Sequence, residues 1–302
     1  MPDLCVIYNP TAGKMRAERR LEAARQAWGA AAVFRPTAHS GHAADLAQAA
    51  ADEGFTTVAA AGGDGTVHDV ATGLLRSGNK DVRFAVIPIG SANDFSFSLT
   101  QMPADLGRID VGRIRRDDGA QKFFLCNVGL GFSGSVTVEA RRLRWLQGSA
   151  LYGVAALRAL ASQYECPMLK IQIDDEPALS TPTLLLAVLL GHREGGFVMA
   201  PDARLDDGLF DYVHAGHLSR WNVLTLLPRL ALFGPPRAHE KIRTGTCRSL
   251  TIESDRPVNV HADGEFLCVK SDGMRAFAID LLPGALAVDI ALSRRGGMPL
   301  RT

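Results

Sequence analysis

Short apolar runs alternate with amphipathic stretches over roughly the first 110 residues of the chain. The runs are apolar throughout, whereas the stretches between them repeat apolar residues every three or four positions, as one face of a helix does. The pattern predicts strands at 4–8, 31–34, 57–61 and 84–87, and helices at 17–28, 43–51 and 67–75. Strands that alternate with helices favour a parallel sheet with helices on both faces.

Strand-like runs dominate the rest of the chain, and the turn residues between several of them favour antiparallel pairing. The predicted strands are 122–128, 168–173, 183–190, 209–214, 249–253, 258–262, 275–280 and 285–292, with helical stretches at 136–164 and 221–233. We therefore expect an α/β domain with a parallel sheet over residues 1–115. A β-rich, sandwich-like domain should follow over residues 116–302, and whether its C-terminal tail returns to the first domain stays open.

The composition is that of a globular protein, and 302 residues are enough for two domains. A formal net charge of +1 predicts no general attraction to nucleic acid. The longest apolar run, residues 184–190, is far shorter than the roughly 20 residues that cross a bilayer, and no signal peptide is visible. The five cysteines form no Cys-x-x-Cys pair, so we expect free thiols and a cytoplasmic location.

A glycine-rich turn joins the strand predicted at 57–61 to the helix predicted at 67–75. It consists of Gly62, Gly63, Asp64, Gly65 and Thr66. Glycine lets the backbone approach a bulky ligand, and the start of a helix favours phosphate. Since a carboxylate repels phosphates unless a cation bridges them, Asp64 points to a nucleotide triphosphate with Mg²⁺. The alternative is a tight turn that binds nothing.

A second loop of small and polar residues follows the strand predicted at 84–87. It begins at Gly90 and continues through Ser91 to Asn93 and Asp94. In parallel α/β sheets, ligands gather beyond the carboxyl ends of the strands. We therefore expect this loop to lie beside the first one, at the same edge of the sheet.

Five motifs along the chain resemble the diacylglycerol kinase catalytic-domain family. They are residues 9–14 (NPTAGK), 62–66 (GGDGT), 90–95 (GSANDF), 201–211 (PDARLDDGLFD) and 263–265 (DGE). The family includes bacterial soluble diacylglycerol kinases, sphingosine and ceramide kinases, and phosphatidylglycerol-kinase-like proteins. NAD kinases and phosphofructokinases share the GGDGT motif, but the series of five motifs in this order is specific.

The resemblance implies an ATP-dependent, Mg²⁺-requiring lipid kinase that transfers the γ-phosphoryl group to the hydroxyl of a diacylglycerol-like lipid. Ser91 stands where the family usually has Thr, so a hydroxyl is kept. The residues expected to contact the nucleotide are Asn9, Thr11, Thr37, Gly62, Gly63, Asp64, Gly65, Thr66, Ser91, Asn93 and Asp94.

Two metal positions follow from the same resemblance. Asp64 and Asp110 match acidic positions near the Mg²⁺ of the nucleotide, although Asp110 could equally lie in a surface turn. Asp207 matches a ligand of a second, structural Mg²⁺, together with the backbone carbonyls of Arg204 and Leu209, because oxygen ligands suit this ion. The alternative for Asp207 is an ordinary Asp-Gly turn.

Asp263 and Glu265 follow the strand predicted at 258–262 and are the candidates for the base that accepts the proton of the lipid hydroxyl. Along a strand, residues 263 and 265 would point to the same side. Glu265 is the first choice and Asp263 the second, and a pair of turn acids is the alternative. Ser133 departs from the family, which usually has Asp after the Gly-Phe pair. The eight histidines show no zinc-binding spacing, and we read them as unremarkable.

Two other functions remain open at this stage: an NAD kinase-like enzyme that phosphorylates a ribose hydroxyl, and a non-catalytic nucleotide or lipid sensor of the same fold. A lipid kinase without a membrane-spanning segment must visit the membrane, so we expect a transient stay at its inner face. The segment 141–146, with three arginines beside Trp145 and Leu146, is the candidate contact, unless it is a solvated helix face. The identity of the lipid stays open, and a homodimer is possible.

Overall fold

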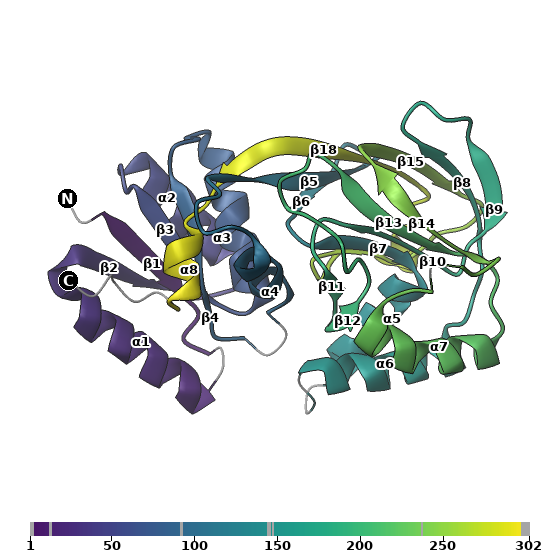
Figure 1. Ribbon diagram of the computed structural model, residues 1–302, viewed down its shortest axis with the longest axis horizontal. Helices are drawn as coiled ribbons and strands as arrows, with labels where there is room; N and C mark the ends of the chain where they lie inside the picture. Colours follow the sequence, from purple (N-terminus) through teal and green to yellow (C-terminus); the bar gives the residue numbers. More distant parts are fainter. Residues whose placement is uncertain are drawn as a thin grey trace. The chain divides into compact units, whose positions relative to one another are not determined.

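The computed structural model describes residues 3–11, 14–90, 93–143, 146, 148–236 and 238–296 (Figure 1). The chain forms two compact units. The first comprises the described residues up to Asp110 together with those from Pro283 onward, and the second comprises Val111–Leu282. Both boundaries fall inside strands, β5 (Arg108–Arg116) and β18 (Ala276–Ala287). No helix among the described residues is long and apolar enough to cross a membrane.

A parallel four-stranded sheet forms the centre of the first unit, in the order β2-β1-β3-β4. One of its two central strands, β3, is buried along its whole length, as expected when helices cover both faces of the sheet. The predicted parallel α/β domain is therefore confirmed. The strands are β1 (Leu4–Tyr8), β2 (Ala32–Pro36), β3 (Thr57–Gly62) and β4 (Arg83–Pro88), and the helices are α1 (Lys14–Trp28), η1 (Gly29–Ala31), α2 (His42–Asp52), α3 (Asp64–Ser77), α4 (Asp94–Gln101) and α8 (Ile290–Arg294).

Two six-stranded sheets dominate the second unit, in the orders β14-β13-β10-β7-β16-β17 and β6-β5-β18-β15-β8-β9. Phe124 of one sheet stacks on Phe210 of the other, with ring centroids 5.5 Å apart, and both are fully buried. The predicted β-rich, sandwich-like fold is thus confirmed. The further strands are β6 (Gln121–Phe124), β7 (Asn127–Gly131), β8 (Met168–Ile173), β9 (Leu179–Pro182), β10 (Leu185–Leu189), β11 (Arg193–Glu194), β12 (Phe197–Val198), β13 (Phe210–Ala215), β14 (Ile242–Cys247), β15 (Ser249–Ser254), β16 (Val260–Ala262) and β17 (Glu265–Cys268).

Three helices cover the first of these sheets: α5 (Phe132–Arg142), α6 (Gly148–Ser162) and α7 (Arg220–Phe233). A cluster of buried side chains from the three helices and from β10, β13 and β14 fills the space between them, including Phe132, Leu160, Val223, Leu189 and Val213. Figure 1 shows α6 and α7 side by side below the sheet. This apolar layer fixes the helices on one face of the unit.

Four predictions for the second half were wrong in detail. The strand predicted at 122–128 is two strands, and the helical stretch at 136–164 is two helices. The strands predicted at 275–280 and 285–292 are the single strand β18 followed by helix α8. The division expected between residues 115 and 116 falls inside β5. Its arginines suit a strand because Arg113 and Arg115 pair with Asp280 of β18, at 2.5 and 3.0 Å.

Close packing of α2 on α3 depends on Gly73. A Cβ atom at this position would lie 2.1 Å from the carbonyl oxygen of Ala44 and 2.8 Å from the Cβ of Ala47. A backbone oxygen cannot move aside as a flexible side chain can. Gly73 therefore sets the distance between α2 and α3.

Gly73→Ala should destabilise the protein by about 1–3 kcal/mol, because the overlap forces the helices apart. Alanine gains about 1 kcal/mol of helix propensity, which offsets only part of this cost. Gly107→Ala is the matched control, since a Cβ there meets nothing within 4 Å. Urea unfolding of the three proteins measures the effect, and equal stability of G73A and wild type would contradict the packing argument.

Candidate functional site

The carboxyl ends of the four parallel strands bring the predicted nucleotide residues together. Thr37 follows β2 and donates its N–H to the carbonyl of Tyr8 at 2.9 Å. Asn9 follows β1 and donates its N–H to the carbonyl of Ala61 at 3.1 Å. Gly90, after β4, donates to the carbonyl of Gly62 at 3.1 Å. These bonds join each loop to its neighbour, so that four loops form one continuous edge.

The two glycine-rich loops touch through their backbones. A Cβ atom at Gly90 would lie 2.4 Å from the Cα of Gly63, and one at Gly62 would lie 2.4 Å from Oγ1 of Thr66. Glycine is therefore required here by packing alone, apart from any ligand. The N-terminus of α3, which begins at Asp64 and includes Gly65, lies directly beyond this contact.

Asp64 holds the second loop in place. Its Oδ2 accepts the backbone N–H of Asn93 at 2.9 Å, and the side-chain amide of Asn93 donates to the carbonyl of Gly90 at 2.8 Å. Asn93 has the left-handed φ of 54° that Asn tolerates, and it precedes the buried Asp94 at the start of α4. The predicted contact residue Ser91 lies outside the described residues. The carboxylate of Asp64 thus joins the two loops directly, and this bond does not require a metal ion.

Asn9 and Thr11 form a closed turn at the end of β1. Oδ1 of Asn9 accepts both the N–H of Thr11, at 2.9 Å, and its hydroxyl, at 2.8 Å. This turn presents a hydroxyl and an amide on the exposed side of the loop edge. Its role in nucleotide binding stays a prediction.

Asp110 does not lie in a surface turn. It is 3% exposed, sits in β5, and its Oδ1 accepts the backbone N–H of Gly284 in β18 at 2.7 Å. Gly284 has a φ of +54°, so the carboxylate binds a kinked point of the neighbouring strand. The contact gives Asp110 a structural task in the first unit, and its predicted role at a metal stays a prediction.

The structure brings Asp207 and Leu209 together, but through the amide of Leu209. Oδ1 of Asp207 accepts this N–H at 3.1 Å, while the Arg204 side chain pairs with Asp206. Burial, and then the charges of Asp207 and Asp202, raise the pKa of the nearby Asp211 to about 6. A cation would relieve this repulsion, which is compatible with the predicted structural Mg²⁺. No cluster of three or more metal-binding side chains occurs among the described residues.

The segment 263–265 forms the turn of a β-hairpin. Asp263 and Gly264 are the two residues between β16 and β17, and both have positive φ, +50° and +77°. This is the geometry of a type I′ turn, for which Asp-Gly is a favoured pair. The expectation that residues 263 and 265 lie on one strand and point to the same side was therefore wrong.

The carboxylate of Asp263 binds three successive backbone N–H groups. Oδ2 accepts from Leu125 at 2.8 Å, and Oδ1 accepts from Cys126 at 2.8 Å and Asn127 at 3.0 Å. Leu125 and Cys126 form the link between β6 and β7, and Asn127 begins β7, which explains why the predicted strand 122–128 is interrupted. A carboxylate that is engaged in this way anchors the hairpin, and this geometry favours Glu265 as the base.

Glu265 is open to solvent and paired with an arginine. Its Oε2 lies 2.6 Å from Nη2 of Arg141 in α5, and the two side chains are 44% and 48% exposed. Arg141 also lies over the ring of Phe266, 4.5 Å from its centroid. An exposed ion pair contributes only about 0–1 kcal/mol, so an incoming group can displace the arginine at little cost.

The predicted membrane segment 141–146 is largely occupied by contacts within the protein. Arg141 binds Glu265, Arg142 binds Glu139 at 2.6 Å, and Leu143 is buried. Arg144 and Trp145 lie outside the described residues. These contacts favour the alternative, a solvated helix face: the side chains of Arg141 and Arg142 are exposed, and Leu143 is the buried anchor.

A buried polar network that the sequence analysis missed lies directly beneath the hairpin. Nε2 of His261 is 3.0 Å from Oε1 of Glu194 and 2.7 Å from Oγ of Ser133, and Ser133 also donates to Glu194. Nδ1 of His261 accepts the backbone N–H of Gly264 at 3.3 Å. This arrangement requires the proton of a neutral His261 on Nε2, which leaves Nδ1 as an acceptor. The one sequence signal was Ser133, at a position where the family has an acid.

Glu194 provides the negative charge of this network. Burial would raise the pKa of Glu194, but the hydrogen bonds that it accepts from His261 and from the hydroxyl of Ser133 hold the pKa below its ordinary value. Glu194 belongs to the short hairpin of β11 and β12, and none of the motifs in the sequence analysis includes it. The network ties this hairpin to the turn that carries Glu265.

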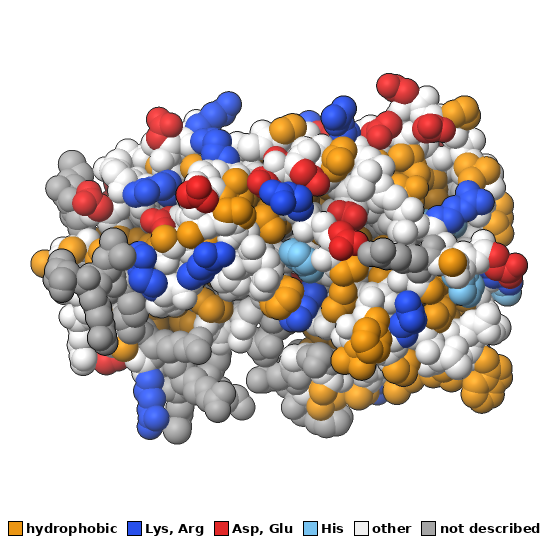
Figure 2. Space-filling model, viewed as in Figure 1, with side chains coloured by type: hydrophobic (Ala, Val, Ile, Leu, Met, Phe, Trp, Pro, Cys, Tyr) orange, Lys and Arg blue, Asp and Glu red, His pale blue; other side chains and the backbone are white. Residues whose placement is uncertain are grey.

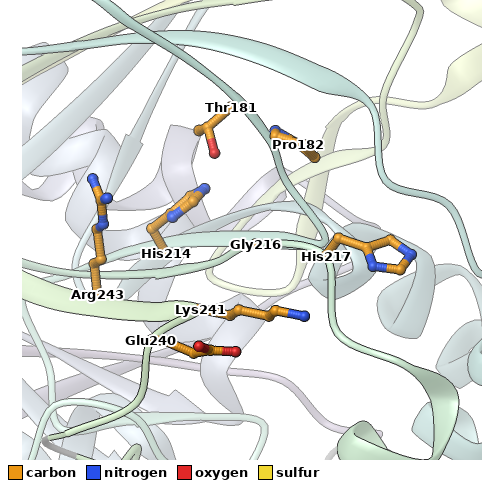
Figure 3. Close-up of a pocket in the computed structure, with 8 residues that line it drawn as sticks. All are labelled: Thr181, Pro182, His214, Gly216, His217, Glu240, Lys241 and Arg243. Carbon is orange, nitrogen blue, oxygen red and sulfur yellow. The ribbon is translucent and has the colours of Figure 1, made fainter.

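A separate pocket of about 200 Å³ opens elsewhere in the second unit (Figure 3). It is lined by Thr181, Pro182, His214, Gly216, His217, Glu240, Lys241 and Arg243. Burial, and then the charge of Arg243, lower the pKa of His214, which shares a hydrogen bond with Thr183 at 2.9 Å. The pocket contains none of the predicted site residues.

Two family models together match most of the chain. The model of the diacylglycerol kinase catalytic domain matches residues 3–120. The model of the YegS C-terminal NAD kinase beta sandwich-like domain matches residues 126–290, and this second match alone covers more than half of the chain. The protein therefore belongs to the diacylglycerol kinase family, a family of lipid kinases, as its motifs predicted.

Individual relatives agree with this assignment. A diacylglycerol kinase of Mycobacterium tuberculosis (strain ATCC 25618 / H37Rv) is 32% identical over 237 residues, which is 74% of each chain. A probable lipid kinase described as YegS-like, from Alcanivorax borkumensis, is 31% identical and covers 77% of this chain and 80% of its own.

Solved structures show the same fold. A putative diacylglycerol kinase from Bacillus anthracis str. Sterne superposes with a TM-score of 0.73 at 22% identity, covering 95% of this chain and 97% of that one. Yeast NADH kinase complexed with NADH superposes with a TM-score of 0.52 at 10% identity, covering 99% and 88% of the two chains. At these identities the likeness concerns the fold alone.

Asp263→Asn should lower the stability of the protein by about 1–3 kcal/mol, whereas Glu265→Gln should change it by at most about 1 kcal/mol. Asparagine keeps Oδ1 and tolerates the positive φ, but its NH₂ group would face the buried N–H of Leu125, which then has no acceptor. Thermal and urea unfolding compare the two variants. A larger loss of stability in E265Q than in D263N would contradict the assignment of the anchor.

Proposed function

We propose that the protein transfers the γ-phosphoryl group of ATP to the free hydroxyl of a diacylglycerol-like lipid, with the help of Mg²⁺. The observation that carries this proposal is the position of Asp64, at the start of a helix and between two glycine loops that touch through their backbones. The helix start favours phosphate, and the carboxylate favours a cation beside it.

In this proposal the nucleotide binds along the loop edge of the first unit. The polar groups of Asn9, Thr11, Thr37 and Ser91 contact its phosphates or ribose, and the backbone of residues 62–66 lies against the phosphates. Asn93 and Asp94 support this contact from the second loop. The glycines leave the backbone N–H groups open to approach, as phosphate sites require.

The residues at the loop edge fit a Mg²⁺ ion that is held partly by the phosphates of the nucleotide. Asp64 supplies carboxylate oxygen at the loop edge, yet no group of three or more metal-binding side chains occurs in the described part of the chain. Mg²⁺ is commonly held by one or two carboxylates together with substrate phosphates, so this donor set suits an ion that arrives with the nucleotide. When bound, the ion would neutralise charge on the phosphates, and Asp64, with Asp110 as the second candidate, would hold it. Asp207 and the carbonyls of Arg204 and Leu209 remain the candidates for a separate structural ion.

Glu265 is the proposed base. It is exposed, and its partner Arg141 is exposed too, so a lipid hydroxyl can reach the carboxylate once the ion pair opens. The carboxylate then orients the hydroxyl and accepts its proton as the oxygen attacks the γ-phosphorus, whose bond to the bridging oxygen breaks to release ADP. Asp263 supports this role because its bonds to backbone N–H groups fix the turn that precedes Glu265. We propose that the reaction takes place in the cytoplasm, at the inner face of the membrane, and the homodimer stays a prediction.

A panel of acceptors tests the proposal. Labelled ATP with Mg²⁺ is offered together with diacylglycerol, phosphatidylglycerol, a sphingoid base or NAD, and we expect label in a lipid and none in NADP. Label in NADP alone would favour the NAD kinase-like alternative, and no transfer to any acceptor despite ATP binding would favour a sensor.

Asp64→Asn provides the control that links transfer to the proposed site. It should reduce turnover by a factor on the order of 10² or more, because an amide does not neutralise the cation. The amide oxygen can still accept the N–H of Asn93, so the fold should survive. A variant that keeps half of the wild-type rate would contradict the role of Asp64.

His261 is proposed to position the turn that carries Glu265, and its two ring nitrogens can be tested separately. In His261→Asn the amide oxygen can replace Nδ1 and accept the N–H of Gly264. In His261→Gln the longer side chain replaces Nε2 and keeps the contact with Glu194. We expect H261N to retain more of kcat than H261Q, by roughly tenfold, because small displacements of a catalytic group are costly.

The KM for ATP should not change in either variant, since His261 belongs to the second unit and the proposed nucleotide residues to the first. Unfolding experiments show how far each variant is destabilised. A higher kcat in H261Q than in H261N would contradict the proposal that the contact with Gly264 positions the base.

A further inference from the structure

Helix α7 is apolar on its outer side as well as on its inner side. Val223 is buried, and the neighbouring leucines pack on the core of the second unit. On the outer side Trp221 is 77% exposed, and Leu232 and Phe233 are each 70% exposed. Trp221 and Leu232 are 11 residues apart, which corresponds to about three turns, so they lie on one stripe of the helix.

Helix α6 continues this surface. Leu157 is 49% exposed and belongs to the outer side of α6, while Ala155, Ala156, Ala159 and Leu160 are buried. The two helices contact each other. Figure 2 shows hydrophobic side chains gathered at the lower right of the molecule, where Figure 1 places α7. We call the outer side of these two helices, with Leu157, Trp221, Leu232 and Phe233, the α6–α7 face.

The charged residues within the two helices have a single sign. Neither α6 nor α7 contains Asp or Glu, and their charged residues are Arg158, Arg220 and Arg229. Arg158 is paired with the buried Glu139 at 2.9 Å, and Arg220 lies over the ring of Tyr164. The pocket of Figure 3, whose lining residue His217 lies three residues before Arg220, carries two cations, Lys241 and Arg243, and one acid, Glu240, so it adds an excess of positive charge near the start of α7.

This combination is typical of helices that lie in the interface of a membrane. Trp, Phe and Leu enter the headgroup region, and arginines reach along the apolar surface to anionic phosphates. A protein partner with acidic groups would match the charge, but a helix that exposes a tryptophan and a phenylalanine at its two ends matches a planar lipid surface better. The absence of acidic residues from both helices removes the repulsion that anionic lipids would otherwise meet.

The same face is connected to the proposed base. Tyr152 of α6 lies against the turn that precedes Glu265, because a Cβ at Gly264 would be 3.8 Å from its hydroxyl. The ring of Tyr152 also packs on Gly195, where a Cβ would overlap it at 2.7 Å. Helix α6 therefore touches the hairpin of residues 263–265 with one end and exposes Leu157 further along.

We propose that the α6–α7 face docks on the surface of an anionic lipid bilayer. The proposal rests on the proposed function, in which the acceptor is a lipid, and it names the surface through which the enzyme reaches that acceptor. It replaces the segment 141–146 as the membrane contact. Trp221, Leu232 and Phe233 enter the interface, and Arg220 and Arg229 meet the headgroups.

Binding to vesicles tests the docking surface. Wild type, the triple variant W221S/L232S/F233S and the control M168S/L179S are sedimented with vesicles of phosphatidylcholine, with and without phosphatidylglycerol. The control removes two exposed apolar side chains of the same unit, which are 40% and 50% exposed in β8 and β9. We expect the triple variant to lose about tenfold or more of its binding to anionic vesicles, and the control to bind as wild type does. Equal binding by all three proteins would overturn the proposal.

Tryptophan fluorescence provides a second measurement that does not depend on the triple variant. The chain has three tryptophans, Trp28, Trp145 and Trp221. Anionic vesicles should shift the emission of wild type to shorter wavelength, and W221F should lack most of this shift. An undiminished shift in W221F would overturn the placement of Trp221 in the interface, as would a shift that self-association of the protein causes without vesicles.

Kinase assays separate this proposal from the proposed function. On a short-chain diacylglycerol below its critical micelle concentration the triple variant should match wild type, and on diacylglycerol in anionic vesicles it should be about tenfold slower. If wild type binds vesicles through this face but phosphorylates no lipid, the docking proposal stands and the proposed function fails. If the variant matches wild type on vesicles, the docking proposal fails and the function stands.

Discussion

Carboxylates that accept backbone N–H groups hold two candidate functional loops and one strand of this protein in place. Asp263 binds three successive amides of the link between β6 and β7, Asp64 binds the amide of Asn93, and Asp110 binds that of Gly284. Loops carry unpaired backbone donors, and a buried donor without an acceptor is costly. An ionised acceptor makes a stronger bond than a neutral one, so these acids fix backbone at loops and at a kinked point of a strand.

This arrangement changes how the acidic motifs of the chain are interpreted. In the DGE segment the two acids divide the work: Asp263 faces inward and anchors the turn, and Glu265 faces outward with an exposed arginine as its partner. In the first unit Asp64 combines both tasks, because one oxygen holds the second loop while the residue sits at a helix start. An acid in a motif can thus have a structural task that the motif alone does not reveal.

In the second unit, the hairpin of residues 263–265 connects a buried polar network to the apolar helices α6 and α7. The network of Ser133, Glu194 and His261 supports the turn before Glu265 from below, and Tyr152 of α6 supports it from the side. Helix α6 in turn lies beside α7, whose outer side carries exposed aromatic residues. Contacts with the hairpin therefore extend without interruption from a buried histidine to an apolar surface helix.

Local patterns in the sequence determined the parallel sheet of the first unit and its helices α1, α2 and α3. Its apolar runs form the strands β1 to β4, its predicted helices repeat apolar residues every three to four positions, and GGDGT occurs at the predicted strand–helix turn, because these features depend on neighbours within a few positions. The tertiary structure alone decided that residues 122–128 break into two strands, since their amides bind Asp263 more than 130 positions away. It also paired the arginines of β5 with Asp280 and placed Glu194 beside His261. Such contacts join residues that are remote in the sequence, and no local period records them.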